Sequence, residues 1–482
     1  MQNNQKLVLT LLLFVLFGVV ITQLYYTYGV GWDFVAHFLS SKAILSKNFT
    51  NFLTNIISNN QTSIKFGILE SKELYFEIYR APLSIILFSI IDLVSVNYAL
   101  IIYLLLMVIF LFVSIFYISK SMKIEFMVIS SLLILPYLFS FPFFVNSEEI
   151  LSLIFMLFAL GLQIKGKWYS GIFLGLAGLS KYTALIFLPM LLFQTDKKKI
   201  LYSYVGFGLV TLPWLIFNYA FFGNFFYSYF SSISVSLESS PISMPSVISL
   251  LIIIINFIPG IIILTIAKRK NLLNYNLREK IKKPIYKIRN FYLKERAYFI
   301  TIIFSILSLI LFVILGFHES VFDQTRYAYF LYTSIALLIA INITTLKEKG
   351  NTRKKYKLSV YTLYAFSLIC MVGTIILISI NISNLIGVSN LSFFRIFNQN
   401  QNILQSYNLQ NCSIISNDWV YLRYYNISAF SPYGYIKNSS KYPKLIFNYF
   451  GTSPNAISTY NDSVLFKNEN FTLFVNKSSY SC

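Results

Sequence analysis

Gly31-Trp32-Asp33 and Tyr75-Phe76-Glu77-Ile78-Tyr79-Arg80-Ala81-Pro82 form the two ends of a loop that separates the first apolar segment from a longer one. Asp33 stands where the chain leaves the first apolar segment, and Arg80 stands just before the chain enters the second. In a chain this hydrophobic, polar groups held at that boundary are the first place to look for chemistry. The sequence therefore predicts a polar site on this loop, with the other segments as its scaffold.

The composition is that of a polytopic membrane protein. Hydrophobic residues make up 56% of the 482 residues and charged residues 12%, about half the charged share of a soluble domain. The mean hydropathy is +0.66. The net charge of +21 does not indicate a nucleic-acid partner, because lysine and arginine cluster in short connections between apolar runs. Such clusters are typical of cytoplasmic loops.

Two regions near the start of the chain allow two interpretations each. Met1 to Gln23 could be a cleaved signal peptide, but the length of the apolar stretch and the lack of a small-x-small site after it favour a retained first helix, 7–24. The run 82–119 is either two spans or a juxtamembrane segment, 82–97, followed by one span, 98–119. The second interpretation is favoured, because it places the lysines that follow on the cytoplasmic side.

The run 168–193 also allows two interpretations. As a single helix it would bury Lys181 in the membrane, whereas a hairpin of two short segments would turn at Ser180-Lys181-Tyr182. The hairpin is favoured, because it places Lys181 at the exterior edge and leaves the basic loops on both sides of the hairpin in the cytoplasm.

A helix that spans a bilayer needs roughly 20 apolar residues. The predicted fold is an all-α polytopic membrane protein with about eleven membrane segments, some of them short, plus juxtamembrane helices. The amino terminus is expected in the cytoplasm and the carboxy terminus outside, across the plasma membrane. The clearest cytoplasmic loop is 268–296, and the loop 219–245 is expected outside. The predicted membrane segments are 7–24, 98–119, 125–143, 150–164, the two halves of 168–193, 200–218, 246–267, 298–316, 327–345 and 359–380.

Two domains are predicted: a transmembrane domain, 1–380, in which 25–97 is the first exterior loop with its juxtamembrane helices, and a small exterior α/β domain, 381–482. Residues 463–467 and 471–475 predict a β-hairpin, and 412–416 and 444–448 predict further strands. Cys412 and Cys482 could pair on an oxidising exterior side. Glycosylation sequons concentrate in the regions assigned outside, at Asn48, Asn60, Asn381, Asn390, Asn411, Asn426, Asn438, Asn461, Asn470 and Asn476.

The polar residues that stand out lie in four exterior connections. Each has a plain structural interpretation, since carboxylates often cap helices and arginines often anchor a helix at the membrane surface. Together they would place acids and bases on one face of the bundle, where cations can hold an anionic lipid headgroup beside a catalytic carboxylate. These residues are Asp33, His37, Arg80, Glu148, Glu149, Lys181, Tyr182, His318, Glu319, Arg326 and Tyr327.

The order of these features resembles the C-type superfamily of membrane glycosyltransferases, in particular its protein mannosyltransferase and aminoarabinose transferase branch and the archaeal relatives of that branch. The resemblance spans roughly residues 7–345. It is carried by Gly31-Trp32-Asp33-Phe34, Tyr79-Arg80-Ala81-Pro82-Leu83, Asn146-Ser147-Glu148-Glu149, Gly175-Leu176-Ala177-Gly178-Leu179-Ser180-Lys181-Tyr182, Pro213-Trp214, Asn218-Tyr219, Gly223-Asn224 and Arg326-Tyr327.

The resemblance implies a C-type glycosyltransferase fold and transfer of a sugar, with inversion, from a polyprenyl- or dolichyl-phosphate donor to a glycan, lipid or protein acceptor at the exterior face. It implies Asp33 as the base and Glu148 or Glu149 as a second acid, which would help the acceptor or a divalent metal ion. Residues implied to bind the substrates are His37, Arg80, Lys181, Tyr182, His318, Glu319, Arg326 and Tyr327, with Arg80, Lys181 and Arg326 on the phosphate.

One departure from the family pattern concerns the first loop. Asp33 is followed by Phe34, whereas the protein mannosyltransferases have two adjacent acids, and this difference argues against a protein acceptor and against metal dependence. The alternative function is a transporter or flippase of lipid-linked saccharides, which would place ionisable residues near the membrane midplane. A receptor or scaffold is a third interpretation. The exterior-edge position of the ionisable residues favours the enzyme.

Overall fold

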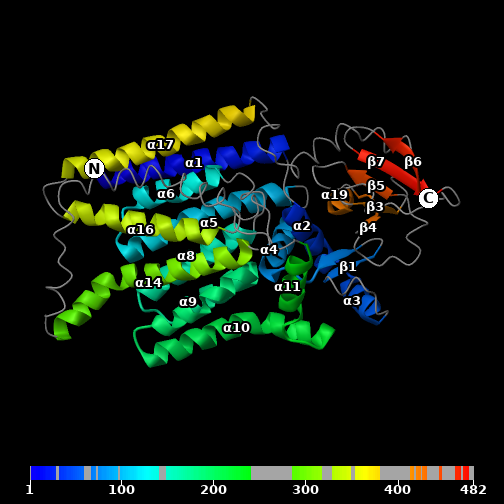
Figure 1. Ribbon diagram of the computed structural model, residues 1–482, viewed down its shortest axis with the longest axis horizontal. Coiled ribbons are helices and arrows are strands. Elements are labelled where there is room, and N and C mark those ends of the chain that lie inside the picture. The colour runs from blue at the N-terminus through cyan, green and yellow to red at the C-terminus, as the bar shows by residue number, and fades with distance from the viewer. Residues whose placement is uncertain are drawn as a thin grey trace.

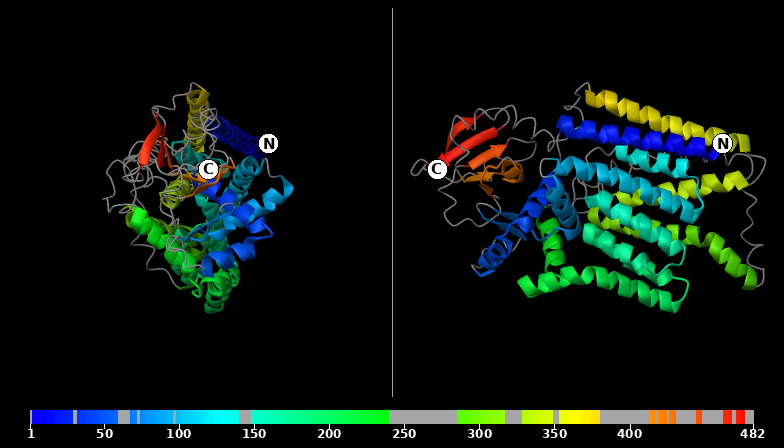
Figure 2. Two further views of the ribbon diagram at one scale, coloured as in Figure 1. Left: turned by 90° about the vertical axis from the view of Figure 1, so that its right-hand side faces the viewer. Right: turned by 180° about the vertical axis from the view of Figure 1, so that it is seen from behind.

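The structure, a computed structural model, has most of its helices side by side in one bundle, with a small sheet at one end (Figure 1). Two further views agree on this arrangement (Figure 2). The end of the bundle next to the sheet is called the sheet end below. The structure describes residues 2–28, 32–58, 67–71, 74–95, 98–139, 148–239, 285–316, 328–348, 353–379, 413–416, 419–424, 426–430, 444–447, 462–467 and 471–476.

The bundle consists of apolar helices, as predicted. Among the described residues, three helices are long and apolar enough to cross a membrane: α5, α10 and Arg296–Ile314 of α14. Segment 246–267 lies outside the described residues, and the number of spans stays a prediction. The helices are α1 (Gln2–Tyr28), α5 (Ala99–Met122), α6 (Phe126–Phe139), α8 (Glu148–Ile164), α9 (Ser170–Ser180), the 3-10 helix η2 (Tyr182–Phe193), α10 (Lys197–Phe222), α14 (Ile285–Gly316), α16 (Tyr329–Glu348) and α17 (Arg353–Ser379).

The predicted division of 82–119 is confirmed. A short helix, α4 (Pro82–Val94), ends before α5 begins. Pro82 is the first residue of α4, where its fixed φ suits a helix and its missing N–H costs no intrahelical hydrogen bond. Ile90 and Val94 are exposed on α4 while Phe88 is buried. This apolar exposed side is expected of a helix at a bilayer surface.

The predicted hairpin in 168–193 is also confirmed. Helix α9 ends at Ser180, Lys181 has extended backbone angles (φ −154°, ψ 121°), and η2 begins at Tyr182. Pro189 lies within η2 and cannot donate a backbone hydrogen bond, which disfavours a regular α-helix there. Lys181 therefore lies at a turn rather than in the middle of a long helix.

The region 25–81, expected as a loop, is largely regular structure. It contains α2 (Trp32–Leu45), α3 (Phe49–Ser58) and an antiparallel hairpin of β1 (Ile68–Glu70) and β2 (Tyr75–Glu77). Helix α3 is amphipathic: Phe52 and Leu53 are buried, whereas Thr50, Asn51, Thr54 and Asn55 are exposed. Helix α2 is buried along most of its length, because α4, β2 and α3 pack against it.

Two other predicted loops are shorter than expected. Helix α10 continues to Phe222 and ends at Gly223, whose φ of +68° suits glycine. Helix α11 (Tyr227–Ser239) then occupies about half of the predicted loop 219–245. Helix α14 begins at Ile285, within the basic segment 268–296.

Helices α9 and α10 pack at backbone distance because of a glycine. A Cβ atom on Gly171 would lie 1.8 Å from the carbonyl oxygen of Ser203, so only glycine fits there. Helix α9 also packs against α8 and η2. This close packing fixes the position of the turn at Lys181.

The C-terminal region forms a five-stranded sheet in the order β4-β3-β5-β7-β6. The predicted hairpin is confirmed as the antiparallel pair β6–β7, and the predicted strands near 412–416 and 444–448 are confirmed as β3 and β5. The sheet's short helix α19 packs on α2 of the bundle. The domain boundary at 380 stays a prediction, and Cys412 and Cys482 lie outside the described residues. The elements are β3 (Ile414–Ser416), α19 (Trp419–Tyr424), β4 (Ala429–Phe430), β5 (Lys444–Phe447), β6 (Asp462–Lys467) and β7 (Phe471–Asn476).

Candidate functional site

Asp33 and Arg80, at the two ends of the predicted loop, are in contact. Nη2 of Arg80 lies 2.7 Å from Oδ1 of Asp33, and the two side chains are 9% and 14% exposed. Nε of Arg80 also contacts Oε2 of Glu77, whose side chain is buried. A guanidinium group that binds two carboxylates through different nitrogens is held in one orientation. The loop therefore closes into an ion-pair chain, Asp33–Arg80–Glu77.

Helix α2 and strand β2 position this chain. Asp33 lies in the first turn of α2, where the helix dipole favours a carboxylate. One turn later, Nδ1 of His37 contacts the backbone carbonyl oxygen of Asp33, so the two residues share a face as predicted. On β2, Tyr75 and Glu77 are two residues apart and point to the same side. The Tyr75 hydroxyl donates to Oε1 of Glu77.

Burial governs the chemistry of Tyr75. Burial, followed by the negative charge of Glu77, raises the pKa of the Tyr75 hydroxyl well above its usual value of 10.0. Tyr75 therefore stays a neutral hydrogen-bond donor to Glu77. The backbone N–H of Glu77 in turn donates to the Ser40 hydroxyl of α2 at 3.2 Å.

Tyr182 connects the turn after α9 to the ion-pair chain. Its hydroxyl donates to the backbone carbonyl oxygen of Arg80 at 3.2 Å and accepts from Nε1 of Trp214 at 2.9 Å. Its ring also packs edge-on against Tyr229 of α11, with ring centroids 5.9 Å apart. The structure thus brings Asp33, Arg80 and Tyr182, all predicted site residues, to the sheet end of the bundle.

Lys181 and Glu149 form a second ion pair beside Tyr182. Nζ of Lys181 lies 3.1 Å from Oε1 of Glu149, whose side chain is 1% exposed. Glu149 is in the first turn of α8, and Lys181 is at the turn between α9 and η2. The predicted second acid and a predicted phosphate-binding cation are therefore paired with each other.

The remaining predicted site residues are not placed by the structure. The side chain of Glu148 and residues His318, Glu319, Arg326 and Tyr327 lie outside the described residues. Contributors that were not predicted include Glu77, Tyr75 and Trp214. Glu77 stands three residues before Arg80, a spacing at which an acid and a base can pair, and this spacing was the available signal.

The described residues do not form a metal site. Within the described ranges, no three His, Cys, Asp or Glu side chains are grouped so that they could hold one ion. The carboxylates of Asp33 and Glu77 are bound to Arg80 instead.

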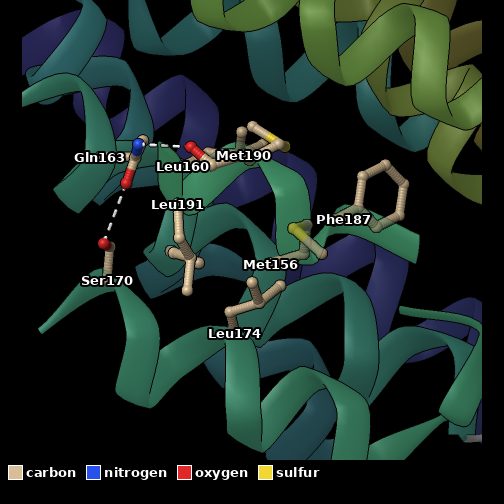
Figure 3. Close-up of a pocket in the computed structure, with 9 residues that line it drawn as sticks. Met156, Leu160, Gln163, Ser170, Leu174, Phe187, Met190 and Leu191 are labelled. Carbon is tan, nitrogen blue, oxygen red and sulfur yellow. Dashed lines mark hydrogen bonds between the residues drawn. The ribbon is translucent and has the colours of Figure 1, made fainter. Parts of the chain in front are cut away.

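An apolar pocket lies deeper in the bundle, between α8, α9 and η2 (Figure 3). Its polar edge is Gln163, which donates to the carbonyl oxygen of Met190 at 2.8 Å and accepts from the Ser170 hydroxyl at 3.0 Å. The lining contains none of the predicted site residues. It consists of Met156, Ala159, Leu160, Gln163, Ser170, Leu174, Phe187, Met190 and Leu191.

Residues 81–267 match the model of glycosyltransferase family 87. No curated protein sequence matches the chain. The family match confirms the predicted enzyme class, a glycosyltransferase, and its range begins one residue after Arg80.

The whole chain also has the fold of a solved structure, ArnT from Cupriavidus metallidurans bound to undecaprenyl phosphate. The TM-score is 0.60 at 10% sequence identity, over 97% of this chain and 98% of that chain. This similarity confirms the predicted fold, that of a multi-pass membrane protein.

Proposed function

Because residues 81–267 match a glycosyltransferase family, we propose that this chain moves a sugar from a polyprenyl- or dolichyl-phosphate donor to an acceptor, at the exterior face of the plasma membrane and with inversion. The contact between Asp33 and Arg80 carries the proposal, because it joins a carboxylate base to a cation that suits a phosphate. The undecaprenyl phosphate bound to ArnT, a protein of the same fold, supports a polyprenyl phosphate as the carrier.

The reaction is a single displacement. The acceptor hydroxyl oxygen attacks the anomeric carbon while the bond between that carbon and the phosphate oxygen breaks. The hydroxyl proton passes to the carboxylate of Asp33, and the lipid phosphate leaves with the bonding electrons. A phosphate is stable as an anion, so cations that stabilise its developing charge take the place of a general acid.

Arg80 couples the two halves of this reaction. Before reaction its charge is shared between the carboxylates of Asp33 and Glu77. When Asp33 takes up the acceptor proton it loses its charge, and the attraction of Arg80 for Asp33 falls. The positive charge of Arg80 is then available to the leaving phosphate, at the moment when negative charge develops there.

Lys181 would supply a second cation for the phosphate, held in place by Glu149. Tyr182 would fix Arg80 through its backbone carbonyl group, and His37 would stiffen the first turn of α2. Roles for Glu148 as an acid, and for His318, Glu319, Arg326 and Tyr327 in substrate binding, belong to the same proposal.

The charge distribution supports the proposed orientation. Helix α2, which has Asp33 in its first turn, lies at the sheet end, whereas the connection from α8 to α9 and the start of α10 lie at the opposite end (Figure 1). That connection contains Lys165 and Lys167, and α10 starts at Lys197. Basic residues mark the cytoplasmic side of a membrane protein. The sheet end would then face the exterior, with the amino terminus of α1 in the cytoplasm.

The test uses the full chain in membranes with a panel of radiolabelled polyprenyl- and dolichyl-phosphate sugars. Asp33→Asn removes the base and is expected to lower transfer at least about 100-fold. Asp196→Asn is the control, because Asp196 is exposed and caps α10, and asparagine caps helices equally well. Transfer that survives Asp33→Asn would remove Asp33 from the mechanism. A folded wild type that transfers none of the sugars would overturn the proposed function.

A further inference from the structure

Arg423 links the C-terminal sheet to the hairpin that precedes Arg80. It lies in α19 and is 8% exposed, which is unusual for an arginine. Nε donates to the backbone carbonyl oxygen of Ala429 at 2.5 Å, and the guanidinium carbon lies 5.3 Å from the ring centre of Phe430. These contacts tie Arg423 to β4, an edge strand of the C-terminal sheet.

The other nitrogens of Arg423 reach across to the β1–β2 hairpin. Nη2 donates to the backbone carbonyl oxygen of Ser71 at 2.8 Å and lies 3.7 Å from Oε2 of Glu70. Nη1 donates to the carbonyl oxygen of Leu74 at 3.4 Å. The guanidinium carbon also lies 5.6 Å from the ring centre of Tyr75. Arg423 thus contacts both ends of the turn that joins β1 to β2.

From Tyr75 the contacts continue into the candidate site. The Tyr75 hydroxyl donates to Glu77, Glu77 pairs with Arg80, and Arg80 pairs with Asp33. The first two contacts join neighbours on β2 or directly after it, and the third reaches the first turn of α2. A shift of the hairpin by a fraction of an ångström would therefore move Glu77 relative to Arg80.

We propose that Arg423 is a positioning residue: by fixing the β1–β2 hairpin to the C-terminal sheet, it sets the place of Glu77 and so holds Arg80 against Asp33. The C-terminal domain would then be part of the machinery that keeps the site ordered. The activity readout of this inference rests on the proposed function, whereas its structural readout does not.

The docking of α19 on α2 does not by itself require a buried arginine with several hydrogen bonds. Helix α19 also contacts α2 through Tyr424 and Phe38, whose ring centroids are 5.9 Å apart. Apolar contacts of this kind dock a domain without the desolvation cost of a buried cation. Burial lowers the pKa of Arg423, against the opposing effects of Glu70 and Tyr75. The hydrogen bonds to Ser71 and Leu74, which apolar packing cannot replace, fix the hairpin in one position.

The experiment compares the full-length wild type with Arg423→Ala and Arg423→Lys. Lysine keeps the charge near Glu70, but its single ammonium cannot reach Ala429, Ser71 and Leu74 together as the guanidinium does. Val464→Ala is the matched control, because Val464 is in the same sheet but exposed. Amide hydrogen exchange is measured over 75–80, over the first turn of α2 and over α5, and transfer activity is measured on the same preparations.

Arg423→Ala is expected to speed exchange over 75–80 and the first turn of α2, with α5 unchanged, and to lower kcat about 10- to 100-fold, as misplaced catalytic groups do. Arg423→Lys should fall between Arg423→Ala and the wild type, and Val464→Ala should match the wild type.

Unchanged exchange over 75–80 in both variants would overturn the inference, as would an equal increase over α5. If Arg423→Ala does not fold, the amide hydrogen exchange of Arg423→Lys over 75–80 alone tests the inference. A wild type without transfer activity would remove the proposed function and leave the exchange result to judge Arg423.

Discussion

Nη2 of Arg80 lies 2.7 Å from Oδ1 of Asp33, although the two residues are 47 positions apart in the chain. Two helices and a hairpin separate them, and α4 begins two residues after Arg80. The ion pair therefore closes the first polar region of the chain into one unit.

Arg80→Lys separates charge from geometry. Lysine keeps the positive charge, but its ammonium cannot bind Asp33 and Glu77 through separate, fixed nitrogens. We expect the KM for the lipid-linked donor to rise about 10-fold, which corresponds to about 1.4 kcal/mol of donor binding, and kcat to fall as well. Steady-state kinetics measure both values, with the exposed Lys198→Ala as control. If the KM and kcat of Arg80→Lys equal those of the wild type, the reaction does not need the separate, fixed nitrogens of the guanidinium group.

Lys181 and Glu149 provide a test that separates stability from activity. Removing one partner of a buried pair leaves the other charge uncompensated, so Lys181→Met and Glu149→Gln should each lower the melting temperature. The double variant should recover most of that loss and still lack full transfer activity, since Lys181 would be missing from the phosphate site. Thermal unfolding in detergent and transfer assays measure the two effects. Full transfer activity in the double variant would show that the Lys181–Glu149 ion pair has a structural role only.

Gly171→Ala tests the close packing of α9 on α10. The new Cβ would lie 1.8 Å from the carbonyl oxygen of Ser203, so one helix must move. We expect a loss of roughly 1–3 kcal/mol in the free energy of unfolding. Gly208→Ala in α10 is the matched control, because no atom lies within 4 Å of its new Cβ, and alanine in a helix is favoured by up to about 1 kcal/mol. Equal stability of the two variants would contradict the packing.

Asp92 gives a pH dependence with a defined sign. Burial raises the pKa of its carboxyl group above the usual 3.8, and this outweighs the opposite effects of Lys42 and of the Ser41 hydroxyl group. Between the usual and the raised pKa, the folded protein binds more protons than the unfolded protein, so stability falls as the pH rises through that range. Asp92→Asn should therefore melt at a higher temperature at pH 7, and the difference should shrink as the pH falls towards 4.

Asp196 should behave in the opposite way and serves as the control for Asp92. A hydrogen bond from the backbone N–H of Lys199 lowers the pKa of the Asp196 carboxyl group. The contribution of that carboxylate to stability is present at neutral pH and is lost as the pH falls through the lowered pKa. Melting curves of Asp92→Asn and Asp196→Asn between pH 3 and 8 should show these two trends. The same trend in both variants would reject the interpretation of Asp92.

Sequence reasoning predicted the features that depend on long apolar runs and on the placement of charge. The turn at Lys181 followed from the cost of burying a charge in the membrane and from the rule that basic loops lie in the cytoplasm. The division between α4 and α5 followed from the same rule on basic loops. The β1–β2 hairpin could not be predicted, because strands of three residues carry too little alternation to be recognised.

The residues that hold the candidate site in place show the same limit of prediction from sequence. Asp33 and Arg80 were predicted as site residues, because each stands at the edge of an apolar segment. The link from Arg423 to Ser71 joins residues 352 positions apart and depends on how α19 docks on α2, which no local pattern encodes. The residues that hold the site in place are therefore harder to predict than the residues expected to do chemistry.

The 3-10 form of η2 has a geometric consequence. A 3-10 helix rises about 2.0 Å per residue, so the 12 residues of η2 cover about 24 Å, whereas α9, with 11 residues at about 1.5 Å each, covers about 17 Å. The two arms meet at Lys181, and at the other end Gln194 donates to the Ser170 hydroxyl at 2.7 Å. Arms of unequal length that share both ends cannot stay in contact throughout. The apolar pocket lined by Leu174 of α9 and Phe187 of η2 lies between these two arms and α8.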